Sequence, residues 1–61
     1  MTQDKNRLKR NWVEQAVSLA LRGSWDEAVA INDRILSLFP NDADAYNRLG
    51  KAYTELGRYA D

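Results

Sequence analysis

The chain repeats its own pattern of residue types at an interval of 34 residues. When it is aligned with itself at that offset, aromatic, small, apolar and glycine positions meet partners of similar type. The matched pairs are Trp12 with Tyr46, Ala16 with Gly50, Leu19 with Tyr53, Gly23 with Gly57 and Trp25 with Tyr59. An interval of this length is typical of folds in which one supersecondary unit recurs and packs on its neighbour. The chain is therefore predicted to contain successive similar units.

Gly23, Pro40 and Gly57 divide the sequence into three stretches with apolar residues at helical spacing. In each stretch the apolar residues return every three or four positions, which places them on one or two faces of a helix. A glycine can end a helix in the left-handed conformation, and a proline disfavours helix in the residue before it. The predicted fold is all-α: an antiparallel helix-turn-helix hairpin followed by a third helix. The expected helices cover residues 5–22, 25–38 and 43–56.

Local signals at the helix ends support these boundaries. Ser24 and Glu27 have the spacing of a capping box, in which each side chain accepts a hydrogen bond from a free backbone N–H. Asp42 is expected to cap the third helix. Ion pairs at four-residue spacing are expected on the solvent side of that helix: Asp44 with Arg48, and Lys51 with Glu55. The residues after Gly57 are expected to begin a fourth helix.

The marker residues of both copies resemble those of a known repeat family. Tyr46, Leu49, Gly50 and Tyr53 follow the aromatic-x₂-Leu-Gly-x₂-Tyr pattern of the tetratricopeptide repeat, a helix-turn-helix unit of 34 residues. The earlier copy has residues of the same kind at the corresponding places: Trp12, Ala16, Leu19, Ala28 and Pro40. It departs from the family pattern at Gln15, Asn32 and Ile35. The alternative fold is a generic three-helix bundle, which does not by itself require the 34-residue interval.

The resemblance covers residues 9–61 and implies a fragment of a tetratricopeptide-like α-solenoid. Residues 1–8 are then a basic lead-in, residues 9–42 a first repeat, and residues 43–61 the first helix and turn of a second, incomplete repeat. Solenoid repeats bury their faces against neighbours, and about three are usually needed for stability. The truncation therefore predicts an apolar face on the third helix that another chain covers.

A protein–protein interaction module is the function that the resemblance implies. We expect self-association as a homodimer or higher homo-oligomer, by packing or by exchange of the third helix. The candidate self-association face consists of Leu49, Gly50, Tyr53 and Leu56. The alternative is a structural part of a longer scaffold that offers a peptide-binding groove. Size-exclusion chromatography with light scattering distinguishes an oligomer from a monomer.

In the family, first helices of successive repeats line a concave groove for extended or helical peptides. The candidate groove residues, carried over by position, are Arg10, Val13, Val17, Leu21, Asn47 and Lys51, with Asp44 and Glu55 beside them. Chaperone-binding members hold a peptide carboxylate with Lys and Asn at the places of Val13 and Val17, so that binding mode is disfavoured here. The competing interpretation is that the valine stripe is a second face buried by a partner.

Composition argues against most other functions. Nine basic and nine acidic residues cancel, which leaves little long-range field to attract nucleic acid or anionic membranes. No apolar run approaches the roughly 20 residues that span a bilayer. With no His and no Cys, we predict no enzyme, no catalytic residue, no metal site and no cofactor. The lack of cysteine favours a cytoplasmic protein.

One basic cluster, at the N-terminus, suggests a nucleic-acid contact: Lys5, Arg7, Lys9 and Arg10. Basic residues in the first turns of a helix oppose the helix dipole, so a frayed, solvated start is the favoured interpretation. The neighbouring Trp12 lies on the predicted core stripe and is not free to stack on bases. Nucleic acid therefore remains the least favoured partner.

Overall fold

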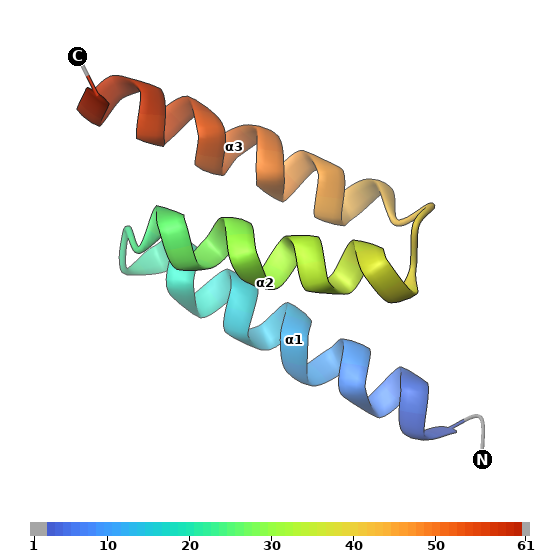
Figure 1. The fold of residues 1–61 in the computed structure, drawn as a ribbon. Coiled ribbons are helices and arrows are strands. Elements are labelled where there is room, and N and C mark those ends of the chain that lie inside the picture. Colours follow the sequence, from blue (N-terminus) through green and yellow to red (C-terminus); the bar gives the residue numbers. More distant parts are fainter. Residues whose placement is uncertain (1–2, 61) are drawn as a thin grey trace.

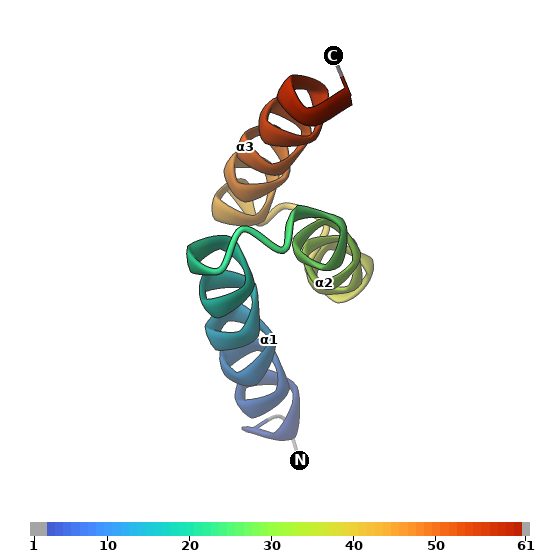
Figure 2. The same cartoon turned by 90° about the vertical axis from the view of Figure 1, so that its left-hand side faces the viewer.

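The structure, a computed structural model, describes the backbone of residues 3–60 and the side chains of residues 5–57. Its described part contains three helices: α1 (Gln3–Leu21), α2 (Trp25–Leu38) and α3 (Ala43–Ala60). Successive helices run in opposite directions, and α2 packs against both α1 and α3 (Figure 1). Seen from the side in Figure 2, the three helices form a bent row with α2 at the apex. The predicted hairpin with a third helix is confirmed.

The turn between α1 and α2 is built around Gly23, as predicted. Gly23 has a φ of 73°, in the left-handed region that favours glycine. Its N–H donates to the Ala20 carbonyl at 3.0 Å, and the Ser24 N–H donates to the Leu19 carbonyl at 2.9 Å. These two bonds form a Schellman motif, which satisfies carbonyls left free at the end of a helix.

The capping box expected at Ser24 is not formed. Ser24 stands at the N-cap of α2 but makes no side-chain cap hydrogen bond. The reason lies in the preceding turn, because the Ser24 N–H that Glu27 would reach is already bonded to the Leu19 carbonyl. The end of α1 has taken the donor that the capping box needs.

The turn between α2 and α3 follows the sequence signals closely. α2 ends at Leu38, two residues before Pro40, and the Phe39 N–H still donates to the Ile35 carbonyl at 2.8 Å. Asp42 caps α3 as predicted, because its Oδ1 accepts from the Ala45 N–H at 3.2 Å. Both boundaries are therefore set by chemistry within a few residues of the turn.

The third helix is longer than the sequence predicted. It was expected to end at residue 56 with a turn at Gly57, but α3 continues to Ala60. Gly57 is not among the positive-φ residues and so lies in the helix as an ordinary residue. Glycine in a helix costs about 1 kcal/mol relative to alanine, which the hydrogen bonds of a continued helix can offset. The predicted fourth helix does not begin within the described residues, and Asp61 lies outside them.

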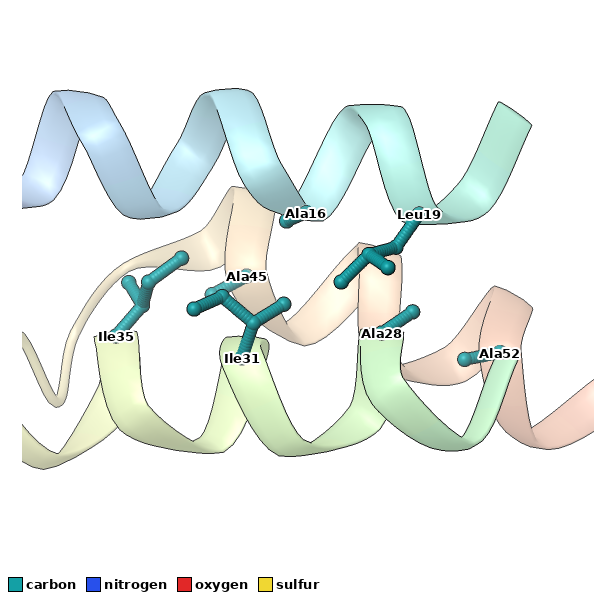
Figure 3. Packing of buried hydrophobic residues seen from close by; sticks show 7 residues of the cluster. All are labelled: Ala16, Leu19, Ala28, Ile31, Ile35, Ala45 and Ala52. Carbon is teal, nitrogen blue, oxygen red and sulfur yellow. The ribbon is translucent and has the colours of Figure 1, made fainter. Parts of the chain in front are cut away.

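The core consists of small and branched side chains at the seams of α2 with its neighbours. Figure 3 shows this cluster, to which all three helices contribute: Ala16, Leu19, Ala28, Ile31, Ile35, Ala45 and Ala52. Alanines at the seams allow the helices to approach closely, and the two isoleucines fill the space between them. Half-buried aromatic side chains, Trp12, Trp25 and Phe39, pack around this cluster.

Candidate functional site

α3 presents an uncovered row of alternating large and small residues on the side that faces away from the core. Tyr46 and Tyr53 are 56% and 55% exposed. Gly50 and Gly57 lie between and beyond them, and a Cβ added at either would meet nothing within 4 Å. Spacings of four, three and four residues place these side chains along one line of the helix. We call Tyr46, Gly50, Tyr53 and Gly57 the α3 outer face.

The candidate self-association residues divide between this surface and the core. Gly50 and Tyr53 are exposed and belong to the α3 outer face, and Leu56 is half-buried. Leu49, which was expected to be uncovered, is buried with 8% of its surface exposed. It lies on the core side of α3, so a partner has little of this side chain left to cover. Tyr46 and Gly57, not included in the predicted face, complete it.

The equivalent residues of α1 show how such a face is normally covered. Ala16 is fully buried and Leu19 is 9% exposed, both in the cluster that α2 helps to form. Trp12 is half-buried and packs against the same cluster. Their counterparts 34 residues later, on α3, have no helix against them in the described structure. The open surface thus arises because α3 is followed by no helix that packs back on it here.

The candidate groove residues lie on α1 and α3 with varied exposure. Arg10, Asn47 and Lys51 are exposed, while Val13 is half-buried and packs against the core. Val17 is 46% exposed and Leu21 is 84% exposed, so most of the predicted apolar stripe is open in a single chain. Whether a peptide or a partner copy lies on it stays a prediction.

A pocket of about 200 Å³ lies among the three helices and contains part of this candidate groove. Its wall is mainly apolar on the α1 and α2 side, and polar where α3 contributes. The lining residues are Ala16, Ala20, Trp25, Ala28, Asn32, Asn47, Arg48 and Lys51. Sequence reasoning identified Asn47 and Lys51 but missed the α2 residues and Arg48, because the pocket exists only once α2 lies behind α1 and α3.

A buried polar pair joins α2 to α3 beside this pocket. Asn32 is 1% exposed, and its Nδ2 donates to the Ala28 carbonyl at 2.8 Å. Its Oδ1 accepts from Nε of Arg48 at 2.7 Å. The Nη2 atom of Arg48 is buried and has no hydrogen-bond partner among the described residues. Asn32, noted in the sequence only as a departure from the family pattern, is therefore a structural link between helices.

This link replaces one of the two ion pairs expected on α3. Lys51 and Glu55 pair as predicted, with Nζ and Oε1 separated by 3.5 Å. Arg48 instead bonds to Asn32, and no pair between Asp44 and Arg48 forms within the described part of the chain. A hydrogen bond between a charged donor and a buried acceptor is stronger than a solvent-exposed ion pair at four-residue spacing. The guanidinium therefore turns toward α2.

Two of the four basic residues in the N-terminal cluster are engaged within the chain. The Nζ atoms of Lys5 and Lys9 lie 5.2 and 4.7 Å from the centre of the Phe39 ring. Lys9 also pairs with Asp42 at 3.1 Å. Cations held over an aromatic ring and beside a carboxylate gain part of their stabilisation from these partners. The cluster thus helps to hold α1 against the turn between α2 and α3.

The pKa of Asp42 reflects its position in this turn. Burial of the carboxyl group, whose side chain is 8% exposed, would alone raise its pKa. The hydrogen bond from Lys9, the Ala45 N–H and the positive charge of Lys9 act in the other direction, and together they lower the pKa below its usual 3.8. The ionised carboxylate therefore stabilises the fold.

None of the described helices has the length and apolar character needed to cross a membrane. A family model for the tetratricopeptide repeat matches residues 32–61. The matched segment begins within α2, passes through the turn at Asp42 and continues along α3. No curated protein and no solved structure matches the chain. Repeats of this kind are typically non-catalytic modules for protein–protein interaction. Together with the three packed helices, the match at residues 32–61 shows that the chain contains a tetratricopeptide repeat and belongs to that family.

Proposed function

We propose that this chain is a protein-interaction module that associates with a second copy of itself through the α3 outer face. The observation that supports this proposal is the alternation of exposed tyrosines with uncovered glycines along α3. Tyrosine supplies a large contact area at low entropic cost, and glycine lets a second helix approach closely. The surface has the residue types of an interface.

The α3 outer face is also complementary to itself. In an antiparallel pair of α3 helices, a two-fold axis between Gly50 and Tyr53 brings these two residues of opposite copies together. The same axis brings Tyr46 of each copy to Gly57 of the other. Each large side chain then meets a small residue, as an interface with two-fold symmetry requires. The zero net charge of the chain opposes such association little.

Size-exclusion chromatography with light scattering tests the proposal. The chain has a mass of 7.0 kDa, so the expected particle has about twice that mass and dissociates on dilution. A particle that stays at 7.0 kDa at millimolar concentration contradicts self-association.

Gly50→Lys is the most specific variant for this test. Lysine is a better helix former than glycine by roughly 0.7 kcal/mol, and nothing within 4 Å obstructs a Cβ at this place. The variant should therefore keep or raise the helical content of the monomer while it abolishes the dimer. Asn47→Lys, at an exposed position on another side of α3, is the matched control and should leave the mass of the dimer unchanged.

A second candidate function is peptide binding in the groove between α1 and α3. The exposure of Val17 and Leu21 favours it, because these side chains remain available when the α3 outer face is covered. Val17→Glu distinguishes the two uses of this stripe. If the stripe itself forms the self-association surface, the variant dissociates the oligomer and lowers thermal stability. If it lines a groove, as we propose, the fold and the particle mass persist.

A further inference from the structure

The pocket between the three helices has the size and wall of a site for one apolar side chain. Its volume is about 200 Å³, and Ala16 and Ala20 of α1 and Ala28 of α2 contribute short side chains to its wall. A protein cavity of about 150 Å³ accommodates benzene. The space therefore fits a leucine or an aromatic ring, and the small residues around it leave that space unfilled.

The polar part of the pocket is positively charged. Arg48 and Lys51 contribute to it, and no acidic residue lies among the lining residues. The Nη2 atom of Arg48 is buried without an acceptor in the described part of the chain, although buried polar atoms are normally hydrogen-bonded. Lys51 already pairs with Glu55, so Arg48 is the cation with unused hydrogen-bonding capacity. The ligand that complements this pocket combines an apolar group with an anionic acceptor.

We propose that the pocket binds an internal peptide segment of a partner protein, in which a leucine-sized side chain is adjacent to an aspartate or glutamate. The apolar side chain occupies the space between the alanines, and the carboxylate accepts a hydrogen bond from Arg48. A peptide is favoured over a free small acid because Val17 and Leu21 offer further exposed apolar surface along α1. This site is separate from the α3 outer face and does not depend on self-association.

The test is a titration of the complete chain with the blocked peptide acetyl-Ser-Leu-Glu-Ser-amide, followed by nitrogen-15 NMR. We expect saturable shifts of the Trp25 indole N–H and the Arg48 Nε–H, since both residues line the pocket. Replacing the leucine of the peptide with alanine, or its glutamate with glutamine, should each weaken binding by about tenfold or more, because each change removes one of the two complementary interactions. N-acetyl-leucine, which offers only a chain-end carboxylate, should bind more weakly than the blocked peptide.

Filling the pocket provides an independent check. Ala20→Leu places a larger side chain in the space and should abolish the shifts, while Ala30→Leu, exposed on α2, should leave them unchanged. Asn47→Phe covers the pocket from an exposed position and replaces Ala20→Leu if that variant does not fold. The proposal is overturned by an absence of saturable shifts, by equal affinity for the glutamate and glutamine peptides, or by equal binding of N-acetyl-leucine. Binding that survives both pocket variants also overturns it.

Discussion

The buried pair of Asn32 and Arg48 should contribute strongly to the packing of α3 on α2. Asn32→Leu keeps a side chain of similar size but removes the acceptor that lies 2.7 Å from Nε of Arg48. The guanidinium is then left with two nitrogen atoms that lack acceptors, since Nη2 has none already. Hydrogen bonds to charged groups contribute about 1.5–3 kcal/mol. Because Arg48 is only half-buried and leucine adds apolar burial, we expect a loss of about 2 kcal/mol.

The reverse substitution should cost somewhat less. Arg48→Met keeps an unbranched apolar stem but leaves the Oδ1 atom of Asn32 without a donor. An unsatisfied neutral acceptor in a protein interior costs about 1–3 kcal/mol. The double variant has neither an orphaned cation nor an orphaned amide, and should lie within about 1 kcal/mol of the wild type. The expected coupling energy of the pair is therefore at least about 1.5 kcal/mol.

Urea denaturation followed by circular dichroism measures these differences. A 61-residue chain is marginally stable, so all variants are compared at one protein concentration in the same stabilising osmolyte. Asp33→Leu, at the exposed neighbouring position, controls for the effect of a new leucine on α2. If the two single changes simply add in the double variant, the bond between Asn32 and Arg48 does not stabilise the fold and this reasoning is refuted.

Two further predictions concern the helix ends. Gly57→Ala should stabilise the fold by about 0.5 kcal/mol, because this glycine lies inside α3, whereas Gly23→Ala should destabilise it by about 1 kcal/mol, because its φ is 73°; thermal unfolding measures both, and a loss of stability in Gly57→Ala would instead place the end of α3 at that residue. The lowered pKa of Asp42 predicts a contribution to stability that is complete above its unfolded value near 3.8 and is lost as the pH falls through the lower folded value. Melting temperatures across this range should show a smaller acid-induced decrease for Asp42→Asn than for the wild type, and identical acid limbs would contradict the prediction.

The sequence predicted the features whose causes are local. The left-handed Gly23, the end of α2 before Pro40 and the cap at Asp42 each depend on backbone groups within about five residues. The two local errors have a common origin in competition between neighbouring elements. Ser24 has the composition of a capping box but donates its N–H to the preceding turn, and Gly57 has the composition of a helix end but lies where helix continues.

The site features were harder to predict because they depend on contacts between helices. Arg48 was assigned to solvent because Asp44 lies four residues before it, yet its partner Asn32 is 16 residues away on another helix. One signal could have revealed the link. Asn32 lies on the same face of α2 as Ile31 and Ile35, and a buried amide requires a partner from a neighbouring element. Searching α3 for a long polar side chain would then have identified Arg48.

The comparison of α1 with α3 also bears on which partner the open surface fits. On α1, Ala16 is covered by α2, which brings the small residue Ala28 to the same cluster, so that seam joins small residues to small ones. The α3 outer face instead alternates tyrosine with glycine, and a helix of the α2 type offers no matching alternation of size. An antiparallel copy of α3 does, because each tyrosine then meets a glycine. For this reason we favour a second copy of the chain over an unrelated amphipathic helix as the partner of α3.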